Sequence, residues 1–298
     1  MHAQPSAPPH TADCSLLVIV SGRREHLRRL VEGVNRADPR PAEIVVVHMG
    51  EPTAPPVPSA VPLRQLHLDD PGGGTLPLAA ARNLAAGAAS CGTLVFLDVD
   101  CIPSRDFFAV LPAAAAAVGG IAMATPRYLG APLPAGAAVD DAVLLDRSVP
   151  HASRAGLVPD GPVRASGRYE MFWTLGFAVD ARTFGRIGGF DESFTGYGAE
   201  DTDFAFSARE LGVPLAYSGA TMFHQHHGSH RPPLNHFADI VANARVFREK
   251  WGGWPMEGWL AAFAERGLVD WTPDARDIAV LRGPTPDEVA AAAHGGPY

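Results

Sequence analysis

Residues 94–103 read LVFLDVDCIP, a run of four apolar residues followed by two aspartates one residue apart. Four consecutive apolar residues are typical of a strand that is buried on both faces of a parallel sheet. We expect this strand to continue to Pro103, so that Asp98 and Asp100 point the same way at its carboxyl end. Ligands of open α/β sheets bind at that edge, and like charges repel unless a cation lies beside them. The stretch predicts a divalent metal site that carries a diphosphate, the alternative being a solvated Asp-x-Asp turn.

Length and composition indicate a folded α/β protein with one large domain or two small ones. The chain has 298 residues, of which 47% are apolar and 19% are charged. Its net charge of −8 and the absence of a Lys/Arg-rich run argue against a nucleic-acid partner. Cys14, Cys91 and Cys101 are odd in number and lack CxxC spacing, which argues against a disulfide framework and favours a cytoplasmic location.

Neither a signal peptide nor a membrane span is expected from the sequence. Residues 1–11 lack a basic segment followed by an apolar run. The most apolar segment, residues 107–124, is interrupted by Pro112 and by Gly119-Gly120, and it is shorter than a bilayer span.

Strands and helices are expected to alternate along the chain. Apolar runs predict strands at 15–20, 43–47, 61–68, 94–103, 121–125, 172–179 and 215–217. Helices are expected over about 23–37, 78–89, an Ala-rich segment after Pro103, 181–186, 200–211 and around 236–251. In the fifth of these, Phe204, Ala208 and Leu211 are expected to face inward. The strand–helix–strand order at the start predicts a right-handed parallel unit. Residues 126–168 are rich in Pro, Gly and Ala, which is typical of a substrate lid or of a surface excursion.

A second acidic group, Glu200, Asp201 and Asp203, falls in the first turn of a predicted helix. Acids there can simply cap free N–H groups and complement the helix dipole. We expect Gly196 and Gly198 to leave room for another molecule to approach the backbone. A carboxylate kept ionised at a helix start can accept a proton from an attacking hydroxyl, so the spacing also favours a catalytic role.

Three histidines follow the last predicted strand, in the sequence His224-Gln225-His226-His227. Each alone could be a surface residue, but His224 and His226 alternate onto one face of an extended chain. Mixed carboxylate and imidazole ligands suit Mn²⁺ better than Mg²⁺, and zinc is the competing ion.

Taken together, the chain resembles a GT-A type glycosyltransferase that uses a nucleotide sugar. The resemblance is to family 2 glycosyltransferases and their galactosyltransferase-like relatives, and it covers about residues 15–230. Its most specific part, GGFDESFTGYGAEDTD at 188–203, is similar to the signatures Gly-Gly-Phe-Asp-Glu and Gly-Trp-Gly-x-Glu-Asp of these proteins. The order of Ala81-Arg82-Asn83, the Asp-x-Asp stretch, this segment and His224-Gln225 also matches.

The resemblance implies an α/β GT-A fold with a mostly parallel, Rossmann-like sheet flanked by helices. The expected glycosyltransferase domain (13–250) has a nucleotide-sugar-binding half (13–125) and an acceptor and catalytic half (126–250). From composition, a disordered tail (1–12) rich in Pro, Ser, Ala and His is expected before it, and a Trp/Pro-rich C-terminal extension (251–298) after it. The implied reaction is an inverting, metal-dependent transfer to an acceptor hydroxyl by direct displacement, in which the metal offsets the charge on the departing diphosphate.

The resemblance also assigns roles to single residues. Asp201 would be the base and Glu200 would hold the acceptor. The metal ligands would be Asp100, Asp98 and His224, with His226 as the fallback, and the ion would be Mn²⁺ or Mg²⁺. The other implied contacts are to the donor for Arg23, Arg82, Asp98, Asp100 and Gly176, and to the acceptor for Trp173, Tyr197 and Glu200.

The sequence departs from the pattern of these enzymes at two strand ends. Ser21-Gly22-Arg23-Arg24 replaces the usual Pro-x-Tyr-Asn-Arg, and Glu51 stands one or two positions after the usual acid that grips the base. A UDP-sugar is favoured as donor, with a GDP-sugar as the alternative. Tyr197 replaces the usual Trp and keeps an aromatic platform.

Two other functions compete with this interpretation. A haloacid-type metal phosphatase would need Asp-x-Asp on the first strand and a later lysine, but Lys250 lies far downstream. A non-catalytic nucleotide-sugar-binding domain would be expected to lack Asp201 or Asp100, and both are present. Three tryptophans near residues 247–263 could contact a membrane or a lipid-linked acceptor, although we favour packing.

Overall fold

The computed structural model describes residues 10–53, 55, 57–70, 72, 74–134, 136–154 and 156–295. Within them, ten strands form one sheet in the order β3-β2-β1-β4-β9-β6-β10-β5, with β7 beside β6 and β8 beside β10. The strands are β1 (Thr11–Val20), β2 (Arg40–Met49), β3 (Leu63–Leu68), β4 (Thr93–Leu97), β5 (Cys101–Pro103), β6 (Ile121–Leu129), β7 (Ser148–Pro150), β8 (Val163–Ser166), β9 (Gly176–Asp180) and β10 (Leu215–His224).

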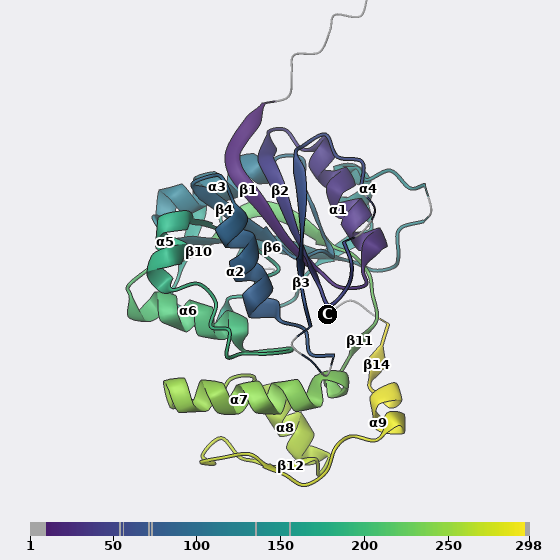
Figure 1. Cartoon of the computed structure of the whole chain (residues 1–298), viewed down its shortest axis with the longest axis vertical. Helices are drawn as coiled ribbons and strands as arrows, with labels where there is room; N and C mark the ends of the chain where they lie inside the picture. The colour runs from purple at the N-terminus through teal and green to yellow at the C-terminus, as the bar shows by residue number, and fades with distance from the viewer. Residues whose placement is uncertain are drawn as a thin grey trace, which may run out of the picture.

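Six strands of this sheet run in the same direction. β3, β2, β1 and β4 are parallel, and β6 and β10 are parallel to each other. β9 lies between the two groups and is antiparallel to both β4 and β6. The carboxyl ends of the six strands therefore share one edge, the lower edge in Figure 1. The predicted α/β fold with a mostly parallel sheet is confirmed.

Helices cover both faces of the sheet (Figure 1). One face packs against α1 (Arg24–Arg36) and α3 (Phe107–Val118), and the other against α2 (Leu78–Ala88), α5 (Ala181–Ile187) and α6 (Glu200–Glu210). β4 shows how the sequence produces these layers. Val95 and Leu97 pack on the first face, and Leu94 and Phe96 pack on the second. An uninterrupted apolar run is thus needed to fill both cores.

The predicted continuation of β4 to Pro103 is wrong. β4 ends at Leu97, and the N–H of Cys101 donates to the carbonyl of Asp98 at 2.9 Å, which closes a tight turn. β5 then leaves this turn and pairs antiparallel with β10. Asp98 and Asp100 consequently belong to a turn, where their side chains need not alternate as in an extended strand.

Several other boundaries differ from the predictions. Of the predicted tail, residues 1–9 lie outside the described residues, whereas 11–12 belong to β1. The predicted strand over 172–179 is shorter, because β9 begins at Gly176 after a 3₁₀ turn at Tyr169–Met171. Leu211, predicted to face inward, is 49% exposed at the end of α6. The segment 126–168 includes α4 (Asp141–Asp146) and two strands of the sheet, β7 and β8.

The C-terminal part lies below the carboxyl edge of the sheet in Figure 1 and has its own core. It contains α7 (Phe237–Trp251), α8 (Glu257–Glu265) and α9 (Pro286–Ala291). Two short antiparallel pairs complete it, β11 (Ser229–His230) with β14 (Ala293–His294) and β12 (Val269–Asp270) with β13 (Ala279–Val280). Trp254 and Trp271 are buried in this core, which supports packing as the role of its aromatic residues.

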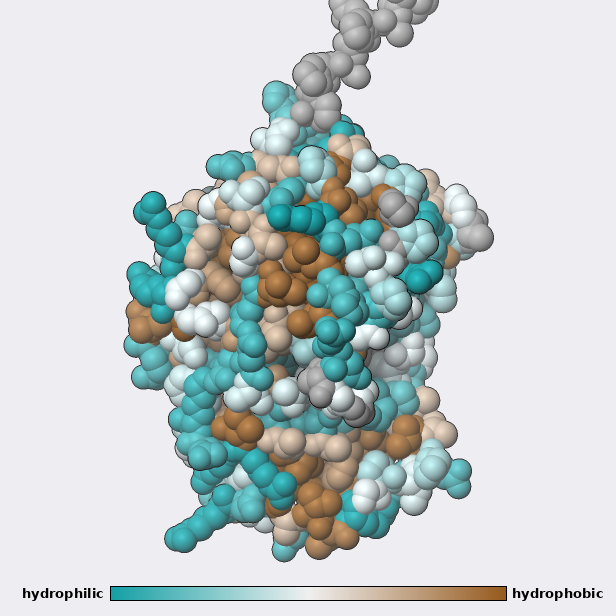
Figure 2. Space-filling model, viewed as in Figure 1, coloured by the Kyte–Doolittle hydropathy of each residue, from teal (hydrophilic) through white to brown (hydrophobic). Residues whose placement is uncertain are grey.

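On the surface of this part, apolar and polar residues are interspersed, as the lower half of Figure 2 shows. Across the described residues, we find no helix with the length and apolar character that crossing a membrane would require.

Candidate active site

The predicted site residues gather at the carboxyl edge of the sheet. Arg23 lies just after β1, the Asp98–Asp100 turn follows β4, and His224 is the last residue of β10. Trp173 and Thr174 precede β9, whose antiparallel direction brings its beginning to the same edge.

Asp100, His224 and His227 form a compact group beside this turn. Each offers one ligand atom, and these atoms all lie within 4.8 Å of one another. Nε2 of His224 is 3.6 Å and Nε2 of His227 is 3.3 Å from the carboxylate of Asp100, which the guanidinium of Arg23 also contacts. One carboxylate and two imidazoles are a ligand set that a divalent transition metal can use.

The protonation states of this group suit metal binding. Burial lowers the pKa of His224 to about 4, so its imidazole is neutral at pH 7, the form in which histidine binds metals. Burial alone would raise the pKa of Asp100, but His224, His227 and Arg23 together hold it well below its usual range. Asp100 therefore stays ionised, and the group has a charged oxygen ligand and at least one neutral nitrogen ligand.

Two predicted ligands lie outside this group. Asp98 faces Arg82 instead, with 3.3 Å between its Oδ1 and a guanidinium nitrogen. Nε2 of His226 lies 2.7 Å from the carbonyl oxygen of Gly295, so its ring points toward the C-terminal part. His227 takes the place predicted for His226 because the chain leaves β10 at His224 and is no longer extended.

Arg82 connects the Asp98 turn to the start of α6. Its buried guanidinium donates to Glu200 at 3.0 Å and to Thr174 at 2.8 Å, and it pairs with Asp98. Arg82 was predicted to contact the nucleotide-sugar donor. In the structure, its two terminal guanidinium nitrogens contact these three side chains. Because the guanidinium of Arg82 contacts both acids, Asp98 and Glu200 lie close together in space although they are 102 residues apart in the chain (200 − 98).

The first turn of α6 carries two carboxyl groups with different surroundings. Oε1 of Glu200 accepts from Arg82, whereas its buried Oε2 has no hydrogen-bond partner among the described residues. A buried acceptor without a donor is costly unless a ligand supplies one. Burial, and after it the neighbouring Glu200, raises the pKa of Asp201 to about 7. A carboxyl group tuned to this range can accept a proton near neutral pH.

The loop before α6 takes its shape from contacts inside the chain. Gly196 has φ +72°, and a Cβ there would lie 2.3 Å from Asp239 of α7. Asn243, also of α7, donates to the carbonyls of Thr195 and Gly198 at 2.9 and 2.8 Å. A Cβ on Gly198 would lie 2.8 Å from Sδ of Met256, at the start of α8. The space that a side chain would fill at these two glycines is therefore taken by residues of the C-terminal part.

Three residues that were predicted to contact a sugar, Gly176, Trp173 and Tyr197, lie against other side chains of the protein. A Cβ on Gly176 would lie 2.5 Å from Sδ of Met222, so packing within the sheet already favours a glycine here. Trp173 packs against Arg154, with 4.1 Å from the guanidinium carbon to the ring centroid. Tyr197 is 37% exposed and stacks on His236 at 4.4 Å between centroids.

An open depression of about 800 Å³ lies at the carboxyl ends of β2 and β3. Its lining includes Glu51, His67, Asp69 and Asp70. Oε2 of Glu51 accepts from the N–H of Gly22 at 2.9 Å, which joins the ends of β1 and β2. Glu51, which comes one or two positions later after β2 than the usual base-binding acid, therefore lines a depression at the same sheet edge as the metal-ligand group.

Two residues of the site were not identified from the sequence. His227 belongs to the histidine run, but the assumption of an extended chain selected its neighbour His226. Thr174 follows Trp173 and had no signal of its own, since only the folded chain shows that its hydroxyl accepts from Arg82.

Part of the chain is similar in sequence to known glycosyltransferases. Residues 162–226 match the family model described as the N-terminal domain of galactosyltransferase. A validoxylamine A glucosyltransferase of Streptomyces hygroscopicus subsp. jinggangensis (strain 5008) is 45% identical over 47 residues, which are 16% of this chain and 11% of that protein. The chain thus matches about a tenth of the length of this curated relative.

Two solved structures resemble the whole fold. GalNAc-T7, solved with UDP, GalNAc and Mn²⁺, has a TM-score of 0.55 and 16% identity, and the match covers 86% of this chain and 50% of that one. S. aureus TarS has a TM-score of 0.55 and 14% identity, and the match covers 86% of this chain and 43% of that one. The chain has the GT-A fold seen in these structures, and its residues 162–226 are similar to the N-terminal domain of galactosyltransferase.

Proposed function

We propose that the chain is a metal-dependent glycosyltransferase that moves a sugar from a nucleoside-diphosphate sugar to an acceptor hydroxyl with inversion. The observation that carries the proposal is the position of Arg82, which contacts Asp98 of the turn and Glu200 of α6 at once. Through it, the metal-ligand group and the two carboxyl groups of α6 share one edge of the sheet. Donor and acceptor can then meet there.

Asp201 is the proposed base. Its carboxylate takes the proton of the acceptor hydroxyl as the hydroxyl oxygen forms a bond to the anomeric carbon of the donor sugar. The bond from that carbon to the diphosphate breaks, and its electron pair leaves with the diphosphate oxygen. Glu200 orients the acceptor through its unpartnered Oε2, which can accept from a second hydroxyl of the acceptor.

Asp100, His224 and His227 would hold the metal ion, and their two imidazoles favour Mn²⁺ over Mg²⁺. A bound divalent cation would offset the negative charge that develops on the departing diphosphate. Mn²⁺ in the GalNAc-T7 structure supports this choice by analogy of fold. Arg23 contacts Asp100 from the loop after β1, where its guanidinium can also reach a diphosphate.

The depression beside Glu51 is the proposed site of the nucleoside, and uridine is the favoured base. The depression lies at the carboxyl ends of β2 and β3. With the nucleoside bound there, the diphosphate would extend along the sheet edge toward Arg23 and Asp100. Tyr197 and Trp173 remain the proposed acceptor contacts, since Tyr197 presents part of its ring to solvent beside α6.

A direct test is the release of UDP from a panel of UDP-sugars in the presence of Mn²⁺ and candidate acceptors. The proposal predicts acceptor-stimulated release by the wild type and release at least about a hundredfold slower by Asp201→Asn. A wild type that binds the donors but releases no UDP with any acceptor would favour the non-catalytic binding domain. Release by Asp201→Asn at close to the wild-type rate would remove this residue as the base.

A further inference from the structure

The last described residues of the chain bind to the loop that carries His227. We call residues 292–295 the C-terminal strap. Its strand β14 pairs antiparallel with β11, with Ser229 opposite His294 and His230 opposite Ala293. Figure 1 shows these two strands side by side below the sheet edge. The strap is thus hydrogen-bonded to residues that directly follow the metal-ligand group.

Hydrogen bonds to the strap lie on both sides of His227. Before it, the ring of His226 lies 2.7 Å from the carbonyl oxygen of Gly295. After it, the N–H of Arg231 donates to the carbonyl of Ala292 at 2.8 Å, and the buried Ser229 donates its hydroxyl to His294 at 3.4 Å. His227 and Gly228 therefore form a short span whose two ends are fixed by residues more than 60 positions later in the sequence.

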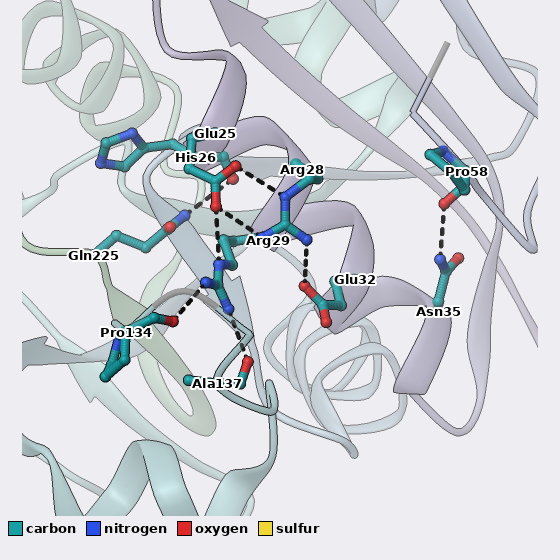
Figure 3. Close-up of polar contacts among 10 residues, drawn as sticks. All are labelled: Glu25, His26, Arg28, Arg29, Glu32, Asn35, Pro58, Pro134, Ala137 and Gln225. Carbon is teal, nitrogen blue, oxygen red and sulfur yellow. Dashed lines mark hydrogen bonds and ion pairs between the residues drawn. The ribbon is translucent and has the colours of Figure 1, made fainter. Parts of the chain in front are cut away.

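The start of this loop, directly after β10, is held by hydrogen bonds of Gln225 to the sheet layer. The side-chain amide of Gln225 donates to the carbonyl of His26 in α1 at 3.0 Å (Figure 3). The N–H of Gln225 donates to the carbonyl of Asp100 at 2.6 Å. This end needs no contribution from the strap, because β10 and the turn after β4 supply it. His224 is accordingly held by the sheet. The ring of His227 lies 3.3 Å from Asp100, and its backbone continues into residues that pair with the strap.

The strap is itself anchored in the C-terminal core. Val289 and Ala292 pack against that core, and α9 begins with a capping box between Thr285 and Glu288. Arg282 adds an ion pair with Glu288 at 2.7 Å. The position of the strap is therefore coupled to the folded C-terminal extension and not to the sheet.

We infer that the C-terminal strap positions His227 for metal binding, so that the C-terminal extension contributes to the metal site without supplying a ligand. The inference rests on the proposed metal site. If the strap is removed, the loop samples other conformations, and the apparent metal affinity falls with the fraction of molecules in which His227 is in place. Groups that orient ligands typically contribute about tenfold or more to metal affinity.

The experiment compares three chains: the full chain, a deletion of residues 292–298, and a matched deletion of residues 296–298 that keeps the strap. Calorimetric titration with Mn²⁺ gives the affinity, and hydrogen exchange of metal-free protein reports on the amides of 226–231. We expect the longer deletion to bind Mn²⁺ about tenfold more weakly and to exchange these amides faster, while the shorter deletion matches the full chain. Equal affinity and equal exchange in the three chains would overturn the inference.

His226→Ala provides a milder second variant, because it removes one bond to the strap and leaves the chain complete. We expect it to weaken Mn²⁺ binding in the full chain and to add no further loss to the 292–298 deletion. An equal additional loss in both backgrounds would identify His226 as a direct ligand and contradict the inference. A full chain that binds no Mn²⁺ would refute the metal site itself, and faster exchange in the deletion would then leave the strap a purely structural role.

Discussion

Replacing Arg82 with Met should destabilise the protein far more than the loss of an ordinary ion pair. The side chain of Arg82 is only 6% exposed, and that of its partner Glu200 is 8% exposed. Removing one partner of a buried pair leaves an uncompensated charge, which typically costs about 3–5 kcal/mol. Thr174 and Asp98 would lose a donor at the same time. We expect urea unfolding at pH 8 to report a loss in this range.

The penalty should depend on pH in a definite direction. Burial already raises the pKa of Asp98 in the folded protein, and Arg82 opposes this rise. Without Arg82 the folded-state pKa of Asp98 would rise further above its unfolded value, so the folded variant would bind more protons than the unfolded one. Stability of the variant relative to wild type should therefore improve as the pH falls from 8 toward 4.5.

Arg168→Met is the matched control, because the pair between Arg168 and Glu170 is exposed. Because an exposed pair contributes little, the urea midpoint of this variant should stay close to that of the wild type at either pH. An Arg82→Met penalty that is no larger than this control, or that does not change with pH, would refute the reasoning that Arg82 neutralises buried carboxylates.

Other substitutions test the packing and the chemistry of the site. Gly176→Ala should lose about 1–3 kcal/mol in urea unfolding because its Cβ would overlap the buried Met222, whereas Gly185→Ala, with nothing within 4 Å, should be neutral or stabilising. Asp201→Asn should lower kcat at least about a hundredfold and leave the KM of the donor nearly unchanged, and a large rise in KM with little change in kcat would speak against a base. Since a base must be ionised, the wild-type rate should fall as the pH drops below the Asp201 pKa of about 7, and a pH profile without this acidic limb would argue against it.

The fold was largely predictable because its signals are local. Uninterrupted apolar runs identified the buried strands, and helical spacing identified α1, α2 and α7 within a few residues. The layers follow from these patterns, since a strand that is apolar at every position needs a helix on each face. Family 2 membership stays a prediction, because the matched family model is that of galactosyltransferase and covers residues 162–226.

The site was less predictable because its details depend on contacts between distant segments. The end of β4 at Leu97 is set by the pairing of β5 with β10, which no local pattern encodes. The choice of His227 over His226 depends on how the chain leaves β10 and on the strap 65 residues later. Gly176 and Gly196 were singled out for contacts with a sugar or another molecule, whereas the neighbours that a Cβ would meet, Met222 and Asp239, are far away in the sequence.

The central claim is that Asp100 and its two histidines hold a cation that in turn binds a nucleoside diphosphate. Calorimetric titration of the wild type and of Asp100→Ala with UDP, with and without Mn²⁺, tests it most directly. We predict that the wild type binds UDP tightly only with Mn²⁺ and that Asp100→Ala loses this dependence and most of the affinity. UDP binding that is equally strong without Mn²⁺, or unchanged in Asp100→Ala, would contradict the account.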